Sequence, residues 1–375
     1  MVAVIWTDWY AYHLARLRAL TEHDRLRGAV VGIELVGGCG VHAGFSFRAA
    51  ERGGLPVVTL LPSADWRKTL EPRLAVALWR KLDEANPSVV LVPGYHTLPA
   101  LCAALWARLH RRRSVLMSET TRADHRRVWW KEFVKRQIVR VLFDSAIAGG
   151  KPHARYLGEL GLHGPIRRAY DVVDNDFYAE GTAEARRTLD RSQLGLPDDY
   201  FLFVGRLASE KNVAGLIAAF ADYRAGGGTA SLVLCGDGPL RGRLMARVER
   251  DGLADCVRFA GLRTAAELLP YYAFARAFVL PSTREPWGLV VNEAMASGLP
   301  VVVSNRCGCA EDLVRGNGFV FDPEAQGELC SCLRKLSAMS AEELQDMGNR
   351  SKAIIAQYSP EIWASEVAHL AGQRC

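Results

Sequence analysis

The 375-residue sequence lacks several features that would assign it to a specialised class of protein. It contains no apolar run of about 18–20 residues, so it predicts no membrane-spanning helix. Its first residues, MVAVIWTDWY, carry no basic start, so we expect no signal peptide. None of its nine cysteines forms a C-x-x-C pair, which argues against a zinc knuckle or a thioredoxin-type site. Reduced thiols in a cytoplasmic protein are the expectation that remains.

Charge is distributed unevenly along the chain. Residues 1–175 contain 26 Lys and Arg against 16 Asp and Glu, a net charge of +10, whereas the whole chain carries +6. The first half therefore favours an anionic surface or substrate, unless its basic residues only face solvent. No nucleic-acid-binding motif accompanies this charge, so no nucleic-acid partner is expected.

What the sequence does contain is a regular alternation of two patterns. Short β-branched apolar runs, such as VAVIW at 2–6 and FLFVG at 201–205, alternate with longer amphipathic stretches. This rhythm predicts an α/β fold with two doubly wound, Rossmann-like parallel sheets that face each other across a cleft. The rhythm pauses at 171–182, DVVDNDFYAEGT, which we interpret as a linker.

The domain prediction follows from that pause. An N-terminal Rossmann-like domain is predicted for residues 1–175 and a C-terminal one for residues 176–358. The last segment, 359–375, has a helical pattern, and we expect it to cross back to the first domain. Asp174 and Asp176 form a D-x-D pair inside the linker, and we interpret them as hinge residues and not as a metal site.

The stretch STREPWGLVVNEAMASGLPVV, at 282–302, carries two glutamates around a predicted helix start. The helix should begin near Gly288 and end near Ser297, where Gly298 stops it. Free backbone N–H groups at such a helix start bind phosphate. Glu285 and Glu293 are carboxylates, which accept hydrogen bonds from the paired hydroxyls of a sugar or ribose.

Cations suited to a diphosphate occur earlier in the same half. In FVGRLASEKN, at 203–212, a strand ends at Gly205 and is followed by Arg206 and Lys211. In LCGDGPL, at 234–240, a second strand ends in a glycine turn at Gly236. Glycine allows a backbone to approach a ligand closely.

Together these segments resemble the retaining GT-B glycosyltransferases of family four, the glycosyl transferases group 1. The resemblance implies that Arg206 and Lys211 stabilise the leaving diphosphate, and that Glu285 contacts the donor sugar. It further implies a set of donor-binding residues: Gly205, Gly236, Gly261, Leu262, Trp287, Gly288, Leu289, Val290 and Glu293. It also implies a metal-independent transfer from a nucleotide-sugar, with a UDP-sugar as the first expectation, and no cofactor. The acceptor would be a sugar, a lipid-linked or a small-molecule hydroxyl in polysaccharide, glycolipid or glycoconjugate biosynthesis.

The acceptor should bind to the first half, where the sequence is less specific. Trp9, Tyr10 and His13 follow the first strand, and could stack on a sugar or pack in the core. His96 and Glu119 follow later strands and are further candidates.

Residues 126–142, RRVWWKEFVKRQIVRVL, form an amphipathic pattern at helical spacing. Two hypotheses stay open for its apolar face. It could dock on its own sheet, or it could contact anionic lipid at the inner face of a membrane.

Other functions also fit parts of the pattern. A non-catalytic scaffold could bind a nucleotide-sugar with the same residues, and an epimerase or phosphorylase could share the fold. A glycosidase could use the two glutamates, although hydrolysis does not need a diphosphate clamp.

Overall fold

The computed structural model describes residues 1–7, 9–37, 53–65, 68–124, 127–192 and 194–372. The chain divides into two compact units: unit 1 comprises Met1–Val173 with Tyr358–Cys375, and unit 2 comprises Asp174–Gln357. Within the described residues, no helix combines the length and the apolar character needed to cross a membrane.

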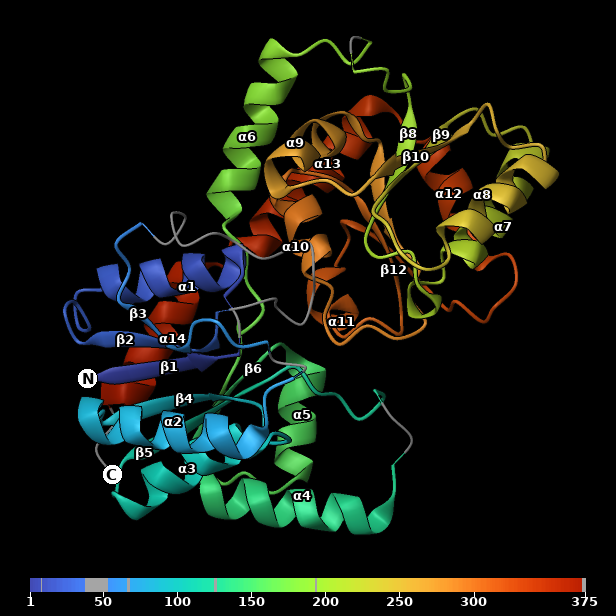
Figure 1. The fold of residues 1–375 in the computed structure, drawn as a ribbon. Coiled ribbons are helices and arrows are strands. Elements are labelled where there is room, and N and C mark those ends of the chain that lie inside the picture. Colours follow the sequence, from blue (N-terminus) through green and yellow to red (C-terminus); the bar gives the residue numbers. More distant parts are fainter. Residues whose placement is uncertain (8, 38–52, 66–67, 125–126, 193, 373–375) are drawn as a thin grey trace. The chain divides into compact units, whose positions relative to one another are not determined.

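Unit 1 is built on a seven-stranded sheet in the order β3-β2-β1-β4-β5-β6-β7 (Figure 1). All of its strand pairs are parallel. The strands are β1 (Val2–Trp6), β2 (Val30–Val36), β3 (Val57–Leu61), β4 (Val89–Pro93), β5 (Arg113–Ser118), β6 (Ser145–Ala148) and β7 (Ile166–Arg167). The helices are α1 (Ala11–Glu22), α2 (Glu71–Ala85), α3 (Leu98–Leu109), α4 (Trp129–Leu142), α5 (Lys151–Glu159) and α14 (Pro360–Gly372).

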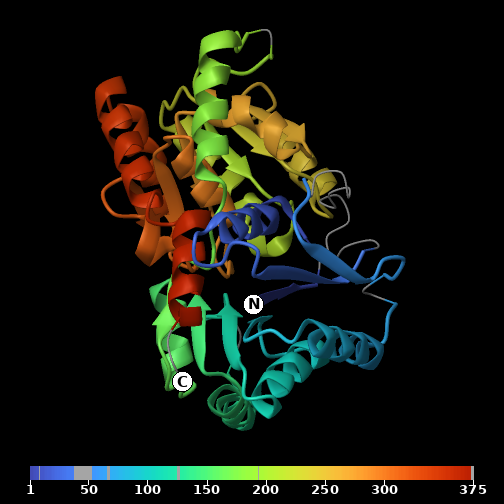
Figure 2. The same cartoon turned by 90° about the vertical axis from the view of Figure 1, so that its left-hand side faces the viewer.

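The last helix completes the core of unit 1. Both views show α14, in red, alongside α1, in blue, and the two helices pack against each other (Figures 1 and 2). Trp363 of α14 is fully buried and lies 6.1 Å from the ring of Trp6 in β1. Burial of so large an aromatic side chain fixes the C-terminal helix to the unit in which the chain begins.

Unit 2 contains a second parallel sheet, of six strands in the order β10-β9-β8-β11-β12-β13. The strands are β8 (Tyr200–Val204), β9 (Ser231–Cys235), β10 (Val257–Gly261), β11 (Ala277–Leu280), β12 (Val301–Ser304) and β13 (Gly318–Phe321). The helices are α6 (Asn175–Thr188), α7 (Val213–Ala225), α8 (Arg241–Arg250), α9 (Ala265–Phe274), α10 (Leu289–Ala296), α11 (Ala310–Leu313), α12 (Glu328–Ala338) and α13 (Ala341–Ile355), with a 3-10 turn, η2 (Ser209–Lys211).

The prediction of two doubly wound parallel sheets is confirmed. In each sheet the strand order reverses direction once, between β1 and β4 in unit 1 and between β8 and β11 in unit 2. Loops diverge at such a reversal beyond the carboxyl ends of the strands, and ligands bind there in open α/β sheets. The residues that follow β8 and β11 are therefore candidates for a ligand-binding site.

The predicted linker at 171–182 is wrong in its second part, because α6 begins at Asn175. Asp174 caps this helix: its carboxylate accepts a 3.0 Å hydrogen bond from the backbone N–H of Phe177. Asp176 lies in the first helical turn, where a negative charge is favourable. The two aspartates therefore belong to the start of a helix. The absence of strand-like runs at 171–182 had instead suggested a linker.

Candidate functional site

Three glycines lie at the carboxyl ends of three adjacent strands of unit 2, where the backbones are in close contact. The backbone N–H of Gly205 donates to Cys235, and that of Gly236 donates to Gly261 over 2.7 Å. Gly236 has a φ of +140°, and a Cβ there would lie 1.9 Å from the carbonyl oxygen of Gly205. Only glycine fits this position, so the turn keeps the edge of the sheet open.

Lys211 and Glu285 meet at the reversal of strand order. The Lys211 ammonium donates a hydrogen bond to the Glu285 carboxylate, and both side chains are largely buried. The Ser282 hydroxyl donates to the same carboxylate oxygen over 3.2 Å. Glu285 is also held through its backbone, because its carbonyl accepts from Gly308 over 3.0 Å. Two residues that lie far apart in the sequence are thus brought together where the strand order of the sheet reverses.

Arg206 is more exposed than Lys211 and pairs with Glu210. The loop that carries Glu210 is tied to the loop after β11, since the Thr283 N–H donates to the Glu210 carbonyl over 2.9 Å. Each of the two predicted diphosphate-binding cations therefore already faces a carboxylate. An incoming diphosphate would compete with these carboxylates for the same donors.

The start of α10 requires an unusual backbone. Gly288 adopts a φ of +105°, which favours glycine, and a Cβ there would come within 2.9 Å of Leu280. Trp287 is buried, and its indole N–H donates to the Asn292 side chain over 2.9 Å. The Trp287 ring therefore anchors the loop. The helix has the predicted bounds and directs its free N–H groups beyond the strand ends.

Glu293 lies one turn into α10 and has partners that the sequence did not predict. The Tyr272 hydroxyl, from α9, donates to its carboxylate over 2.7 Å, and Tyr178 of α6 also interacts with it. Burial raises the pKa of Glu293 from 4.5 to about 7, although hydrogen bonds from Tyr272 and Tyr178 oppose the rise. The sequence analysis did not include either tyrosine among its candidates.

In unit 1, the predicted aromatic candidates lie in a packed cluster. Trp9, Tyr10 and His13 are all buried. The His13 ring stacks on Trp6 with 4.4 Å between ring centroids, and its Nδ1 accepts from the Tyr10 N–H. In this conformation the cluster supports the packing hypothesis for these three residues over sugar stacking.

His96 and Glu119 are exposed at the carboxyl ends of β4 and β5. Glu119 also adjoins a buried charged group that sequence reasoning missed. Burial, followed by the charge of Glu119, raises the pKa of Asp171 well above its ordinary range. Arg16 lies 4.0 Å from Asp171, and its guanidinium stacks over the ring of Tyr170. Glu119 therefore lies beside a buried polar cluster.

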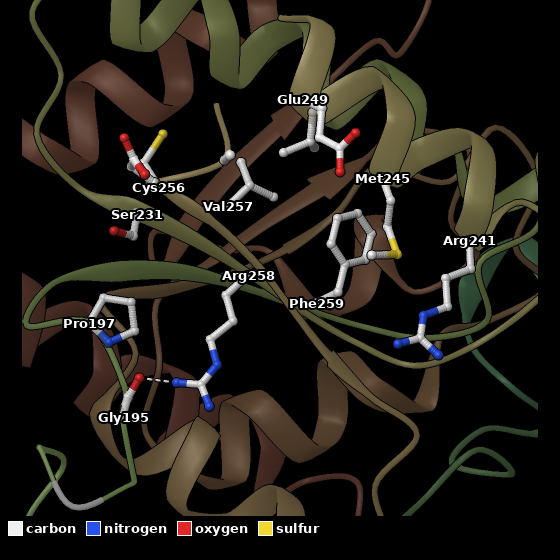
Figure 3. A pocket seen from close by; sticks show the side chains of 13 residues that line it. Gly195, Pro197, Ser231, Arg241, Met245, Glu249, Cys256, Val257, Arg258 and Phe259 are labelled. Carbon is white, nitrogen blue, oxygen red and sulfur yellow. Dashed lines mark hydrogen bonds between the residues drawn. The ribbon is translucent and has the colours of Figure 1, made fainter. Parts of the chain in front are cut away.

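A pocket of about 520 Å³ lies elsewhere in unit 2, between α8 and β10 (Figure 3). Ser231 and Val257, at the starts of β9 and β10, line it together with Met245 of α8. The Arg258 guanidinium is occupied by backbone carbonyls, and Figure 3 shows its bond to Gly195. None of the predicted donor-binding residues lines this pocket, so it is distinct from the candidate site.

Comparison with known proteins gives the family of this site. Residues 186–354, which contain these three glycines and both glutamates, match the model of the family described as Glycosyl transferases group 1. The chain carries a group 1 glycosyltransferase domain. The sequence resemblance is thereby confirmed for the part of the chain that holds the donor-site candidates.

Two curated relatives match part of the chain. Alpha-D-kanosaminyltransferase from Streptomyces kanamyceticus is 31% identical over 172 residues, 45% of this chain and 44% of the relative. Glycogen synthase from Mycobacterium tuberculosis is 38% identical over 155 residues, 41% of this chain and 36% of the relative. The chain thus spans less than half the length of these relatives.

A solved structure extends the comparison to the whole fold. Anabaena HepE, in complex with UDP, superimposes with a TM-score of 0.74 at 19% identity, over 98% of each chain. At this identity the likeness establishes the fold, and the predicted GT-B architecture of two Rossmann-like domains is confirmed.

Proposed function

We propose that this chain is a retaining, metal-independent glycosyltransferase that moves a sugar from a UDP-sugar to an acceptor hydroxyl. The observation that carries the proposal is the pairing of Lys211 with Glu285 where the strand order of unit 2 reverses. The family match covers this region, and the similar Anabaena HepE was solved with UDP. The transferred sugar would enter a polysaccharide, a glycolipid or another glycoconjugate.

Stabilisation of the leaving group is the main catalytic task in this proposal. As the bond between the sugar and the diphosphate breaks, negative charge develops on the diphosphate oxygens. Arg206, Lys211 and the N–H groups at the start of α10 would meet this charge, in the role that a metal ion has in other transferases. Because the donor itself is consumed, no further cofactor is required.

The two glutamates would orient the donor. Glu285, freed from Lys211 by the incoming diphosphate, would accept hydrogen bonds from sugar hydroxyls near the reacting carbon. Glu293 would accept from the ribose hydroxyls, and Tyr272 would hold its carboxylate in place. Gly205, Gly236 and Gly261 would leave room for the nucleotide. Unit 1 would bind the acceptor, with His96 and Glu119 as the exposed candidates.

We further propose a cytoplasmic location, with peripheral contact at the inner face of the membrane through residues 126–142. Residue 126 lies outside the described residues, and 127–142 contain α4. A lipid-linked acceptor would fit such a location.

The donor site can be tested by thermal unfolding with UDP, GDP, ADP and dTDP and with their sugars, each with and without a chelator. A ligand that binds only the folded state raises the melting temperature. We expect a shift with the UDP series that survives chelation in wild type and in Lys81→Met, but not in Lys211→Met. Lys81 is a matched control because it also forms an ion pair, with Glu84, in the other unit.

Three results would count against parts of this proposal. If no nucleotide at millimolar concentration shifts the melting temperature, the donor site is wrong and a non-nucleotide function must be sought. If transfer occurs but NMR shows inversion of the anomeric configuration, the retaining mechanism is wrong. Nucleotide binding with no turnover against any acceptor would favour the scaffold alternative.

A further inference from the structure

Helix α4 presents its apolar side chains to solvent. Trp129 is 82% exposed, and Phe133, one turn later, is 59% exposed. Three further apolar residues of α4 lie on the same exposed face: Trp130, Val134 and Val141. The sequence hypothesis that the apolar face docks on its own sheet is therefore wrong for these five residues, although Ile138 packs against the core. Large exposed apolar patches mark interaction surfaces.

A polar network fixes α4 in this orientation. On the opposite face, Glu132 accepts a 2.7 Å hydrogen bond from the Tyr156 hydroxyl and forms a 2.8 Å ion pair with Lys135. The Arg127 guanidinium packs 4.4 Å from the centre of the Tyr156 ring. Val139 is the one residue of α4 that is buried. The helix is thus held to unit 1 by this network and by Val139, Ile138 and Leu142, which pack against the core, and the aromatic side faces outward.

Basic residues border the exposed apolar face. Lys131, Arg136 and Arg140 are all exposed, and the Lys131 ammonium lies 5.4 Å from the centre of the Trp130 ring. Residues 127–142 contain five basic residues and one acidic residue, within a half of the chain that carries +10. Aromatic side chains on one helix face with lysine and arginine at its border are typical of helices that lie in a membrane interface.

The charge also argues against a second copy as the occupant of this face. In a two-fold symmetric dimer the same patch would face itself, which would place α4 opposite α4. Lys131, Arg136 and Arg140 of one copy would then lie near the same residues of the other copy and repel them. An anionic lipid surface instead provides complementary charge for the basic border and an apolar boundary for the tryptophans.

We propose that α4 docks unit 1 onto an anionic lipid bilayer. The helix would lie in the plane of the interface, with Trp129, Trp130 and Phe133 inserted at the level of the headgroups. Lys131 and Arg136 would contact lipid phosphates. The helix has 14 residues, about 21 Å of length at 1.5 Å per residue, which suits a surface orientation and not a span. This inference does not depend on glycosyl transfer, because it uses no residue of the donor site.

The first test is co-flotation of the full chain with phosphatidylcholine vesicles that contain or lack phosphatidylglycerol. Wild type should float only with the anionic vesicles, with a blue shift of tryptophan fluorescence. Replacement of Trp129, Trp130 and Phe133 by serine should abolish flotation. The control Leu70→Ser/Val76→Ser, which removes two apolar side chains exposed elsewhere on unit 1, should float like wild type.

The second test separates charge from apolar insertion. Each basic residue near an anionic surface contributes about 1 kcal/mol, so Lys131→Gln/Arg136→Gln should weaken binding about 25-fold. The control Arg18→Gln/Arg25→Gln removes two exposed charges from another part of unit 1 and should weaken binding far less. Circular dichroism and UDP-induced thermal shift should be unchanged in all four variants.

Three results would overturn the proposal. Wild type that does not float with anionic vesicles has no such docking face. Equal flotation with neutral vesicles would eliminate the role of the basic border. A dimer in lipid-free sedimentation that the serine variant converts to monomer would assign the face to a second copy of the chain.

Discussion

Glu293 should make the stability of the protein depend on pH in an unusual direction. Its folded pKa of about 7 lies above its ordinary value of 4.5. Between these values the folded state retains a proton that the unfolded state has lost, so folding becomes less favourable as pH rises. The loss of stability is complete above pH 7 and absent below about pH 4.5.

The magnitude follows from the size of the pKa shift. A rise from 4.5 to about 7 corresponds to about 3 kcal/mol, at 1.36 kcal/mol for each pKa unit. This is an upper figure, because Glu293 is only partly buried and solvent screens part of the penalty. Glu293→Gln keeps the shape and the hydrogen-bond acceptor for Tyr272 but cannot ionise.

The assay is urea unfolding of wild type, Glu293→Gln and a control, Glu180→Gln, at half-unit steps from pH 4.5 to 8. Glu180 is an exposed glutamate of α6. The difference in unfolding free energy between Glu293→Gln and wild type should grow with pH by about 2–3 kcal/mol. Parallel pH profiles for the two proteins would refute the reasoning.

The same group gives a signature of donor binding. Ribose hydroxyls that donate to the Glu293 carboxylate favour its ionised form and lower its pKa. Binding of UDP near pH 6.5 should therefore release a fraction of a proton, which calorimetry in buffers of different ionisation enthalpy measures. Glu293→Gln should release fewer protons, because only the phosphate of UDP, whose second pKa is about 6, then contributes. Equal proton release by both proteins would remove Glu293 from the ribose site.

Three further substitutions test separate features of the site. Lys211→Met should lower turnover by about a hundredfold or more in a sugar-transfer assay, because a donor to the developing diphosphate charge is lost. Gly236→Ala should cost about 3 kcal/mol in urea unfolding, since its Cβ would clash with Gly205 at 1.9 Å. Tyr272→Phe should lower the free energy of unfolding by about 1–3 kcal/mol. It should also extend the pH-dependent loss of stability to higher pH, because the Tyr272 hydroxyl lowers the pKa of Glu293. Equal turnover of Lys211→Met and Lys81→Met would contradict the first expectation. The second fails if Gly236→Ala loses no more stability than Gly242→Ala, whose added methyl group meets open space. An unchanged pH profile of Tyr272→Phe would contradict the third.

Much of the fold was predictable because its signals are local. Buried parallel strands require continuous β-branched apolar runs, and the runs at 2–6 and 201–205 became β1 and β8. Gly288 and Gly298 mark the two ends of α10, because both adopt a positive φ, and this requirement acts within a few residues. The α6 helix was missed because strand-like runs are absent from 171–182, and this pause, which includes the first turns of α6, was interpreted as a linker.

The sequence by itself supplied the candidate residues for the chemistry of this protein. The spacing of Arg206, Lys211, Glu285 and Glu293 is a property of the chain, and it pointed to a nucleotide-sugar site before any contact was known. Strand order, which depends on long-range pairing, decided that Lys211 and Glu285 meet. Tertiary packing alone surrounded Glu293 with tyrosines, because hydrogen-bond partners from α6 and α9 leave no periodic signal. It also turned the apolar face of α4 to solvent, since the periodicity of a helix records that it has two faces but not which face packs inward.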